Sequence, residues 1–411
     1  MTNHSPSGLP RPSSFTMTPP SPRTLALGLG AILTAITIPL TMQEGALPLL
    51  VASRLAEEGI APGPTGVIVA LPFVTVAFAA PFADAAYRRL GGMWCLVAGA
   101  LLSILCCLVF PLFFSPVLWG VISLAVGLAL TFRWVSGETW LLAQTPLHLR
   151  GRVLGVQETL IAFSGTVGAL IPVATGMSGA MPFIMLGLLT IPGVIAALIA
   201  GRLLPRTGGE RAIAGTREKT STRGIRFALF AAFSGGAVLH GTFVFLPAIV
   251  PADMMNGHSP LLAASLFCLG SGLLQVPYGL LVDRIGPERL RTLLGVSNLV
   301  AGLFLVFLLD TVLGPAAIFF AGIAIGCFYS WATMTISRVV APRALSGAIA
   351  RLAICQTLGG VIGPPLIGYA IQSLGAPGLG LVLALIGLMV TVAALLHHRH
   401  DRAVTDKRAG S

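Results

Sequence analysis

Residues 279–291 read Gly279-Leu280-Leu281-Val282-Asp283-Arg284-Ile285-Gly286-Pro287-Glu288-Arg289-Leu290-Arg291, a short charged segment between two long apolar runs. Apolar runs of about 18 residues or more are typical of membrane-spanning helices. The aspartate and arginine side chains of the segment cannot remain in hydrocarbon, so the segment is predicted to lie at the membrane surface. Because its charge is mostly positive, that surface is predicted to be cytoplasmic. Gly279 and Gly286 would let two helices and the turn approach closely.

The pattern Gly279-xxx-Asp283-Arg284-x-Gly286-xx-Arg289 resembles the loop signature of the major facilitator superfamily of secondary transporters. In that family the signature lies between helices 2 and 3 and again between helices 8 and 9. A generic basic turn between hydrophobic helices is the simpler interpretation of the string alone. The resemblance implies an all-α integral membrane fold of twelve transmembrane helices in two pseudo-symmetric six-helix bundles.

The first half of the chain carries a weaker copy of the signature in residues 80–89. This copy keeps Asp84, Arg88 and Arg89, but it lacks the two glycines and the first arginine of the family pattern. The resemblance therefore covers the chain by architecture and is sharp only in the second half.

Composition places the whole chain in a membrane. Of the 411 residues, 55% are hydrophobic and 9% are charged, whereas soluble domains carry about 25% charged residues. The net charge of +11 is spread over short connections between apolar segments, which indicates membrane topology rather than nucleic-acid binding. The six cysteines fall in apolar segments without CxxC spacing, so no metal site or disulfide is expected. We find no nucleophile–base set, so an enzyme is not expected.

Twelve apolar segments approach the ~20 residues that a spanning helix needs. They cover residues 24–52, 65–85, 92–114, 117–143, 153–175, 182–204, 225–250, 260–282, 292–309, 315–339, 347–371 and 377–396.

Basic residues predict the orientation of these segments. With a cytoplasmic N-terminus, the outer connections receive only Arg54, which predicts a multi-pass protein of the bacterial inner membrane with both termini in the cytoplasm. A monomer in the lipid bilayer with a small-molecule substrate is expected. The expected parts are a disordered cytoplasmic tail (1–23), an N-terminal six-helix bundle (24–204), a cytoplasmic linker (205–224), a C-terminal six-helix bundle (225–396) and a cytoplasmic tail (397–411).

The two halves of the chain share short sequence motifs at nearly constant spacing. The motif Pro-x-x-Leu-x-Gly begins at Pro146 and again at Pro342, 196 positions later, and Asp84 and Asp283 lie 199 positions apart. Parallel repeats with a binding site between them near the membrane midplane are typical of secondary transporters.

The resemblance implies that each signature aspartate faces the opposite half, with Asp283 near the start of the fifth helix. A carboxylate at a helix N-terminus is stabilised by about 0.3–1 kcal/mol, and Arg150 and Arg152 could add charge-assisted bonds. Such a latch would exist only when the cytoplasmic side is shut; a static surface ion pair is the alternative. The expected gating set is Asp84, Arg88, Arg89, Gly279, Asp283, Arg284, Gly286, Arg289, Arg150 and Arg152.

Two charged residues lie deep in apolar segments. Glu44 is in the first segment, and Arg133 in the fourth is roughly 18 Å from the turn at Thr145, too deep to reach water easily. Such groups need a partner or a function, and the resemblance implies that both helices line the central cavity. We interpret Arg133 as a substrate-binding residue and Glu44 as a proton carrier; a permanent buried salt bridge is the alternative.

Other polar residues complete the predicted cavity. His240 lies within one turn of the position equivalent to Glu44 and could carry protons or serve only in packing. Glu138 and Glu158 are either coupling residues or partners of the nearby arginines. The further cavity candidates are Gln43, Gln275 and Gln356, although single residues of this kind more often form interhelical hydrogen bonds.

The expected function is alternating-access transport of a small organic solute, with H⁺ as the coupling ion and no cofactor. Residues 359–368 resemble the Gly-xxx-Gly-Pro signature of drug/proton antiporters, although those carry it in helix 5, and this displaced match does not establish export. Export of a small organic molecule is the first hypothesis. Uptake of a metabolite, or a non-transporting receptor or assembly factor on the same scaffold, are the alternatives. Arg133 would favour an anionic substrate, whereas the scarcity of other cavity charges suits an amphipathic one.

Overall fold

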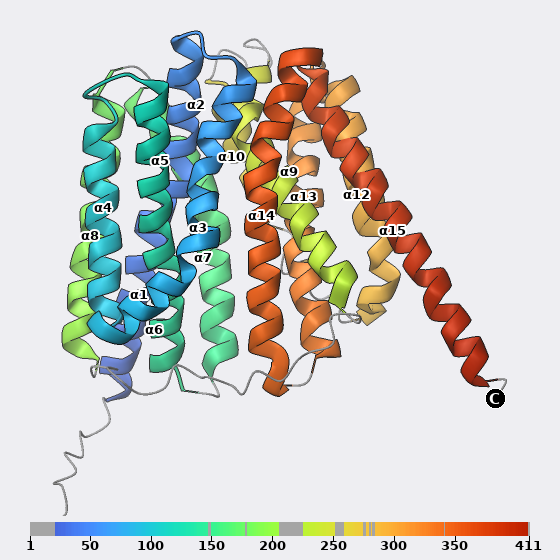
Figure 1. Cartoon of the computed structure of the whole chain (residues 1–411), viewed down its shortest axis with the longest axis horizontal. Coiled ribbons are helices and arrows are strands. Elements are labelled where there is room, and N and C mark those ends of the chain that lie inside the picture. Colours follow the sequence, from blue (N-terminus) through green and yellow to red (C-terminus); the bar gives the residue numbers. More distant parts are fainter. Residues whose placement is uncertain are drawn as a thin grey trace, which may run out of the picture.

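The computed structural model describes residues 21–146, 149–176, 179–204, 225–250, 259–273, 277–278, 281, 284–340 and 342–409. Every regular element among them is a helix, and the helices stand side by side in two halves (Figure 1). The first half contains α1 (Pro22–Leu40), η1 (Thr41–Ala46), α2 (Leu47–Glu57), α3 (Pro62–Leu90), α4 (Gly92–Val109), α5 (Pro116–Thr131), η2 (Phe132–Ser136), α6 (Gly137–Gln144), α7 (Arg150–Thr175) and α8 (Met181–Leu203). The second contains α9 (Arg226–Ile249), α10 (Leu262–Leu273), α12 (Pro287–Leu308), α13 (Gly314–Val339), α14 (Pro342–Leu374) and α15 (Pro377–Ala409).

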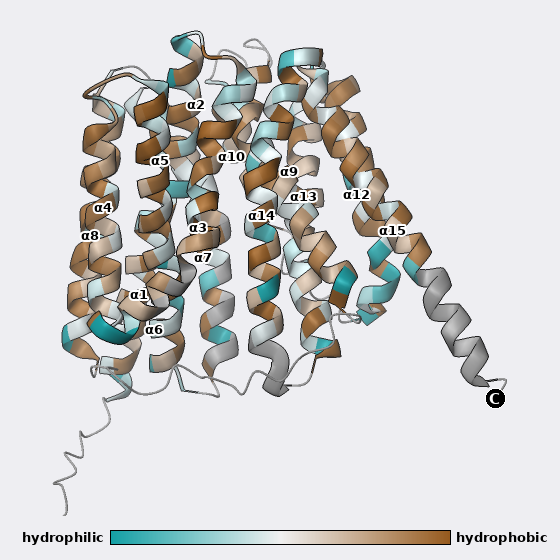
Figure 2. Cartoon of the chain, in the orientation of Figure 1, coloured by the Kyte–Doolittle hydropathy of each residue, from teal (hydrophilic) through white to brown (hydrophobic). Residues whose placement is uncertain are grey.

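The outer surface of the bundle is apolar, as a bilayer requires. Figure 2 shows hydrophobic residues along most of the length of the helices, and large side chains such as Phe78, Leu105 and Phe307 are exposed. Ten helices in the described part are long and apolar enough to cross a membrane, while Thr159–Thr175 and Leu262–Leu273 are shorter apolar helices. The predicted all-helical membrane fold is confirmed, and the count of twelve crossings stays a prediction.

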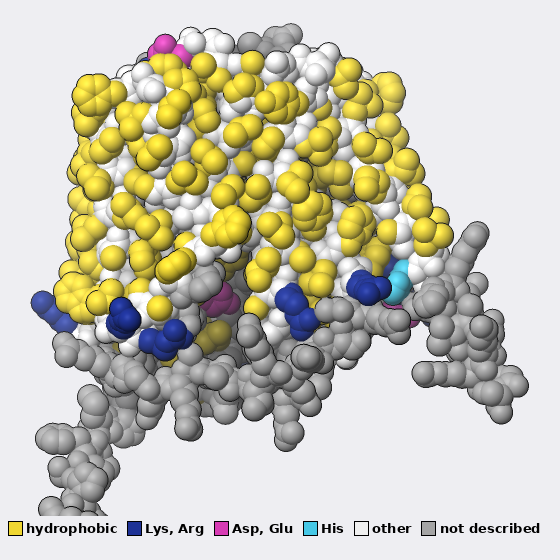
Figure 3. All heavy atoms as spheres, viewed as in Figure 1, with side chains coloured by type: hydrophobic (Ala, Val, Ile, Leu, Met, Phe, Trp, Pro, Cys, Tyr) yellow, Lys and Arg dark blue, Asp and Glu magenta, His cyan; other side chains and the backbone are white. Residues whose placement is uncertain are grey.

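Exposed arginines gather at the end of the bundle where α1 begins, which we call the basic end (Figure 3). The opposite end carries Arg54, whose guanidinium lies 3.6 Å from the Glu58 carboxylate. The arginines exposed toward the basic end in the described part are Arg23, Arg88, Arg89, Arg152, Arg202, Arg226, Arg284, Arg289 and Arg338.

The first-half copy of the signature is not a loop. Residues 80–90 continue α3 as a helix, so Asp84, Arg88 and Arg89 lie on its last turns. The helix ends only at Gly91, whose φ of 82° is a left-handed conformation that glycine adopts without strain. The prediction of a loop is wrong here because no residue between Phe82 and Leu90 interrupts the helix.

The second-half turn begins α12. Arg284 and Arg289 are exposed, whereas Gly279 and Asp283 lie outside the described residues. Gly286 precedes α12 with a φ of 88°, and an added Cβ would meet no atom within 4 Å. Gly286 is therefore needed for its backbone conformation and not, as predicted, for close approach of neighbouring helices.

Replacing Gly286 with alanine should lower the free energy of unfolding by about 1–2 kcal/mol, because an L side chain is disfavoured at this φ. Thermal unfolding of purified protein in detergent measures the change. The control is Gly347→Ala in α14, at a helical position where a Cβ also meets nothing and where alanine should stabilise by up to about 1 kcal/mol. Equal melting temperatures for the two variants would contradict the assignment.

The halves contact each other mainly through two helix pairs, α3 with α14 and α7 with α10, and also where α2 meets α9. In the first pair, a Cβ on Gly66 or Gly368 would overlap the backbone of the facing helix, and the Gly63 N–H donates to Gln372 Oε1 at 3.2 Å. In the second pair, Ser265 Oγ donates to the Thr166 carbonyl at 3.4 Å. These contacts lie away from the basic end, so the halves are joined at the other end of the bundle.

The small-residue stretch 359–368 packs α14 against α9. A Cβ on Gly359 or Gly363 would overlap the carbonyl oxygen of Phe233 or Ala237, and Gly236 lies equally close to Gln356. The two helices pack closely here, since backbone atoms occupy the space that side chains would need.

Candidate functional site

A cavity of about 230 Å³ lies between the two halves. Its walls come from α1, η1, α3, η2, α6 and α7 of the first half and from α9, α10, α13 and α14 of the second. Figure 3 shows the molecule hollowed between the halves on the side of the basic end. The halves are joined at the opposite end, so the hollow lies on the side where they are not held together.

The two charges predicted inside the membrane meet in this cavity. The Arg133 guanidinium donates to the Glu44 carboxylate at 3.0 Å. Both residues lie in π-helical turns, Glu44 in η1 and Arg133 in η2. A π-helical turn adds one residue to a helix and displaces the side chains around it, and such turns are frequent at functional sites.

Arg133 is held from a second side as well. Its Nε donates to Gln43 Oε1 at 3.2 Å, and the Gln43 amide in turn donates to the Ser103 hydroxyl. Ser103 donates to the Gly99 carbonyl at 2.8 Å. These bonds form a polar chain that joins the first, third and fourth spans within an otherwise apolar half.

The two members of the pair differ in their access to the cavity. The Arg133 side chain is 4% exposed and the Glu44 side chain 29% exposed. The carboxylate is therefore the group that a solute or water molecule can reach, while the guanidinium is occupied by Glu44 and Gln43. Both interpretations of Arg133 and Glu44 stay predictions, and this geometry favours Glu44 as the exchanging group over Arg133 as an anion ligand.

His240 lines the second-half side of the cavity. Its ring lies 4.1 Å from the Phe73 ring of α3, centroid to centroid, so it packs across the boundary between the halves. His240 lies 196 positions after Glu44, and Tyr329 lies 196 positions after Arg133, the spacing of the repeated proline motif. The charged pair of the first half is thus matched by a histidine and a tyrosine in the second.

The other predicted coupling residues are only partly placed. Glu138 lines the cavity beside Trp134. The side chains of Glu158 and Arg150 lie outside the described residues, and Arg152 is exposed. Glu138 is therefore a cavity residue in this conformation, and its role in coupling stays a prediction.

The predicted glutamines separate into three cases. Gln356 lines the cavity, Gln43 is buried in the polar chain behind it, and Gln275 lies outside the described residues. Sequence reasoning missed Gln157, which lines the cavity from α7. Its signal was its position, 199 residues before Gln356, the spacing that also relates the two signature aspartates.

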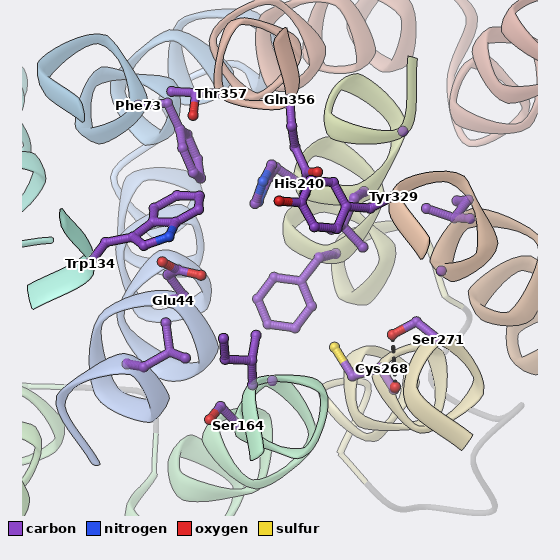
Figure 4. A pocket seen from close by; sticks show the side chains of 18 of the residues that line it. Glu44, Phe73, Trp134, Ser164, His240, Cys268, Ser271, Tyr329, Gln356 and Thr357 are labelled. Atoms are coloured by element: carbon purple, nitrogen blue, oxygen red, sulfur yellow. Dashed lines mark hydrogen bonds between the residues drawn. The ribbon is translucent and has the colours of Figure 1, made fainter. Parts of the chain in front are cut away.

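Sequence reasoning also did not identify Phe73, Trp134 and Tyr329 as cavity residues. Figure 4 shows the rings of Phe73, Trp134, His240 and Tyr329 directed into the space between helices of both halves, with the Glu44 carboxylate directed into the same space. An aromatic residue in an apolar segment gives no signal of this kind, because the sequence does not say which face of its helix is turned inward.

The proposed latch lies at the edge of the described structure. The side chains of Asp84 and Asp283 are outside it, and the placed members of the gating set are Arg88, Arg89 and Arg152, together with the turn residues discussed above. The latch stays a prediction for the conformation in which the basic end is closed.

Known proteins resemble this chain in sequence and in fold. Residues 254–411 match the family model described as Major Facilitator Superfamily. A protein of Bacillus subtilis (strain 168) named as the uncharacterised MFS-type transporter YfkF is 24% identical over 344 residues, which cover 79% of this chain and 84% of that protein.

Two solved structures have similar folds. The nucleoside transporter NupG gives a TM-score of 0.71 at 12% identity, covering 90% of this chain and 98% of that chain. A bacterial homologue of the human lysosomal transporter Spinster, in an inward-facing and occupied conformation, gives 0.71 at 16% identity, covering 94% and 98%. At these identities the likeness describes the fold.

Proposed function

We propose that the chain is a membrane transporter of the major facilitator superfamily, the family whose model matches residues 254–411 and to which the similar protein of Bacillus subtilis is assigned by name, and that it is a proton-coupled exporter of a small organic solute. It acts in the bacterial inner membrane by alternating access, with the basic end in the cytoplasm. The observation that carries the proposal is the Glu44–Arg133 pair, whose carboxylate is reachable from the cavity between the halves.

The pair offers a physical route to coupling. Protonation of Glu44 removes one charge and leaves Arg133 buried with only Gln43 as a partner, which is unfavourable in this conformation. A ligand that binds one conformation better shifts the equilibrium toward it, and a proton on Glu44 acts in this way. The other ionisable groups that line the cavity in the described part are His240, Glu138, Cys268 and Tyr329.

Alternation is supported by the contacts between the halves. The α3–α14 and α7–α10 pairs touch away from the basic end. The hollow between the halves lies on the side of the basic end. Rocking of the halves would break these contacts and close the basic end, where the signature aspartates would then find their partners. Export as the direction rests on the resemblance of residues 359–368 to the antiporter signature.

Flux measurements test the proposal. Compounds that raise the melting temperature of the purified protein are loaded into proteoliposomes, and their transport is followed with and without an imposed pH gradient. We expect transport of the solute by the wild-type protein to depend on the imposed pH gradient, because protons that move down the gradient would drive the solute in the opposite direction. Transport that is indifferent to the gradient, or unaltered by Glu44→Gln combined with His240→Ala, contradicts proton coupling.

A further inference from the structure

Two glutamine side chains in the cavity wall have carbonyl oxygens without a hydrogen-bond partner. Gln157 on α7 is 3% exposed, and its Oε1, like the Oε1 of Gln356 on α14, is buried and unpaired among the described residues. Of all the unpaired buried polar atoms in the described part, these are the two whose residues line the cavity. Figure 4 shows Gln356 directed into it.

An unpaired buried acceptor is unfavourable, and native proteins retain few of them. A cavity wall is the place where such an atom can obtain its partner from outside the chain. The amide oxygens accept hydrogen bonds and cannot donate them. Gln157 and Gln356 therefore indicate a ligand that brings N–H or O–H donors.

The two acceptors belong to opposite halves of the molecule. Gln157 lies on α7, which packs against α10, and Gln356 lies on α14, which packs against α3. A ligand bonded to both is held by the two bodies that move during alternating access, and its binding then depends on their relative position. A transported substrate needs this property and a structural cofactor does not.

Much of the remaining wall is aromatic or aliphatic, and its charges are few. Phe73, Trp134 and Tyr329 present their rings to the cavity (Figure 4). Of the charged side chains in the wall, Glu44 and Arg133 are paired with each other, and Glu138 is the other carboxylate in the described part of the lining. Flat apolar walls with few free charges favour a planar, uncharged ring system.

We propose that the substrate is an uncharged planar aromatic or heteroaromatic molecule whose N–H or O–H groups donate to Gln157 and Gln356, while its ring packs among Phe73, Trp134 and Tyr329. The inference rests on the proposed function and names the substrate class of the same cavity.

Two matched fluorescent probes test the donor requirement. The probe 7-amino-4-methylcoumarin carries N–H donors, and 7-dimethylamino-4-methylcoumarin has the same ring system without them. Equilibrium binding to the purified wild-type protein in detergent is followed by the probe's fluorescence. We expect the amino compound to bind about tenfold more tightly, because a site with unpaired acceptors discriminates against a ligand that leaves them unpaired.

Methionine variants then identify the acceptors. Gln157→Met and Gln356→Met keep an unbranched side chain of similar length, and each should weaken binding of the amino compound severalfold while leaving the dimethylamino compound unchanged. The matched control is Gln144→Met, since Gln144 is a glutamine of α6 outside the cavity lining, and it should change neither affinity. Thermal unfolding gives a second readout, because removing an unpaired buried acceptor should leave the melting temperature unchanged or raise it.

Three results overturn the inference: equal affinity of the wild-type protein for both probes, binding of neither probe, and an unchanged preference in the Gln157→Met/Gln356→Met double variant. A fall in melting temperature for the single variants also counts against it, because it would indicate a structural partner for each amide. The binding assay needs no proton gradient. Its failure therefore leaves proton-coupled transport standing, whereas loss of gradient dependence with binding intact removes the proposed function alone.

Discussion

Replacing Glu44 with glutamine should reduce gradient-driven transport by about 100-fold, the largest functional effect that we expect from a single conservative substitution. Glutamine imitates the protonated carboxyl group but cannot release a proton. Arg133 is then left buried with Gln43 alone, and removing one partner of a buried ion pair costs about 3–5 kcal/mol. That penalty falls on the conformation described here, so the variant should favour the alternative one and fail to cycle.

Thermal stability separates this mechanism from simple misfolding. Glu44→Gln and Arg133→Gln alone should each lower the melting temperature in detergent, whereas the Glu44→Gln/Arg133→Gln double variant should recover most of the loss, because no unpaired charge remains. Transport by the double variant should stay uncoupled from the pH gradient. If the double variant regains both stability and gradient-driven transport, Glu44 and Arg133 form only a structural salt bridge and the coupling proposal is wrong.

Replacing Gly363 with leucine should prevent the second half from folding, the largest effect on stability that we expect. A Cβ at this position overlaps the carbonyl oxygen of Ala237 on α9, and backbone atoms of a packed helix cannot turn aside as a side chain can. Even Gly363→Ala should cost about 1–3 kcal/mol through overpacking. The yield of monodisperse protein and its melting temperature in detergent measure both effects.

The chain supplies a matched control for this substitution. Gly30 lies in α1, another membrane-spanning helix, and a Cβ there meets nothing within 4 Å. Gly30→Leu should leave the yield unchanged, and Gly30→Ala should stabilise by up to about 1 kcal/mol. A Gly363→Leu protein that folds and melts like the Gly30→Leu protein would show that the contact between α9 and α14 is not close.

Much of the fold could be predicted from the sequence, because a long apolar run inside the hydrocarbon of a membrane must form a helix in this chain. A backbone that leaves water must pair its own N–H and C=O groups, and a helix does so locally. Residues such as Gly286 and stretches such as 359–368 are informative for a similar reason, since only glycine fits where φ is positive or where two backbones meet. The role expected for Gly286 was nevertheless wrong. The sequence shows that a glycine is present, but not whether the position requires a positive φ or a close approach of two backbones.

Parts of the candidate site were beyond the same reasoning. Glu44 and Arg133 stood out as costly charges that could form a salt bridge. The sequence did not reveal that Gln43 also bonds to Arg133, or that Glu44 keeps access to the cavity. The π-helical turns that carry both residues decide how their side chains are aimed. Such turns have no clear sequence signal, since they depend on how neighbouring helices pack.

The sequence by itself determined that this chain is a helical membrane protein with repeated halves, a basic side and a few ionisable residues inside the apolar spans. Each of these properties follows from local composition and from the cost of placing charge and unpaired backbone in hydrocarbon. Only the tertiary structure decided that Glu44 meets Arg133 across 89 positions of chain and that Gln157 faces the cavity with an unpaired oxygen. These facts depend on the rotation of each helix about its axis, which is set by packing against helices that are distant in sequence.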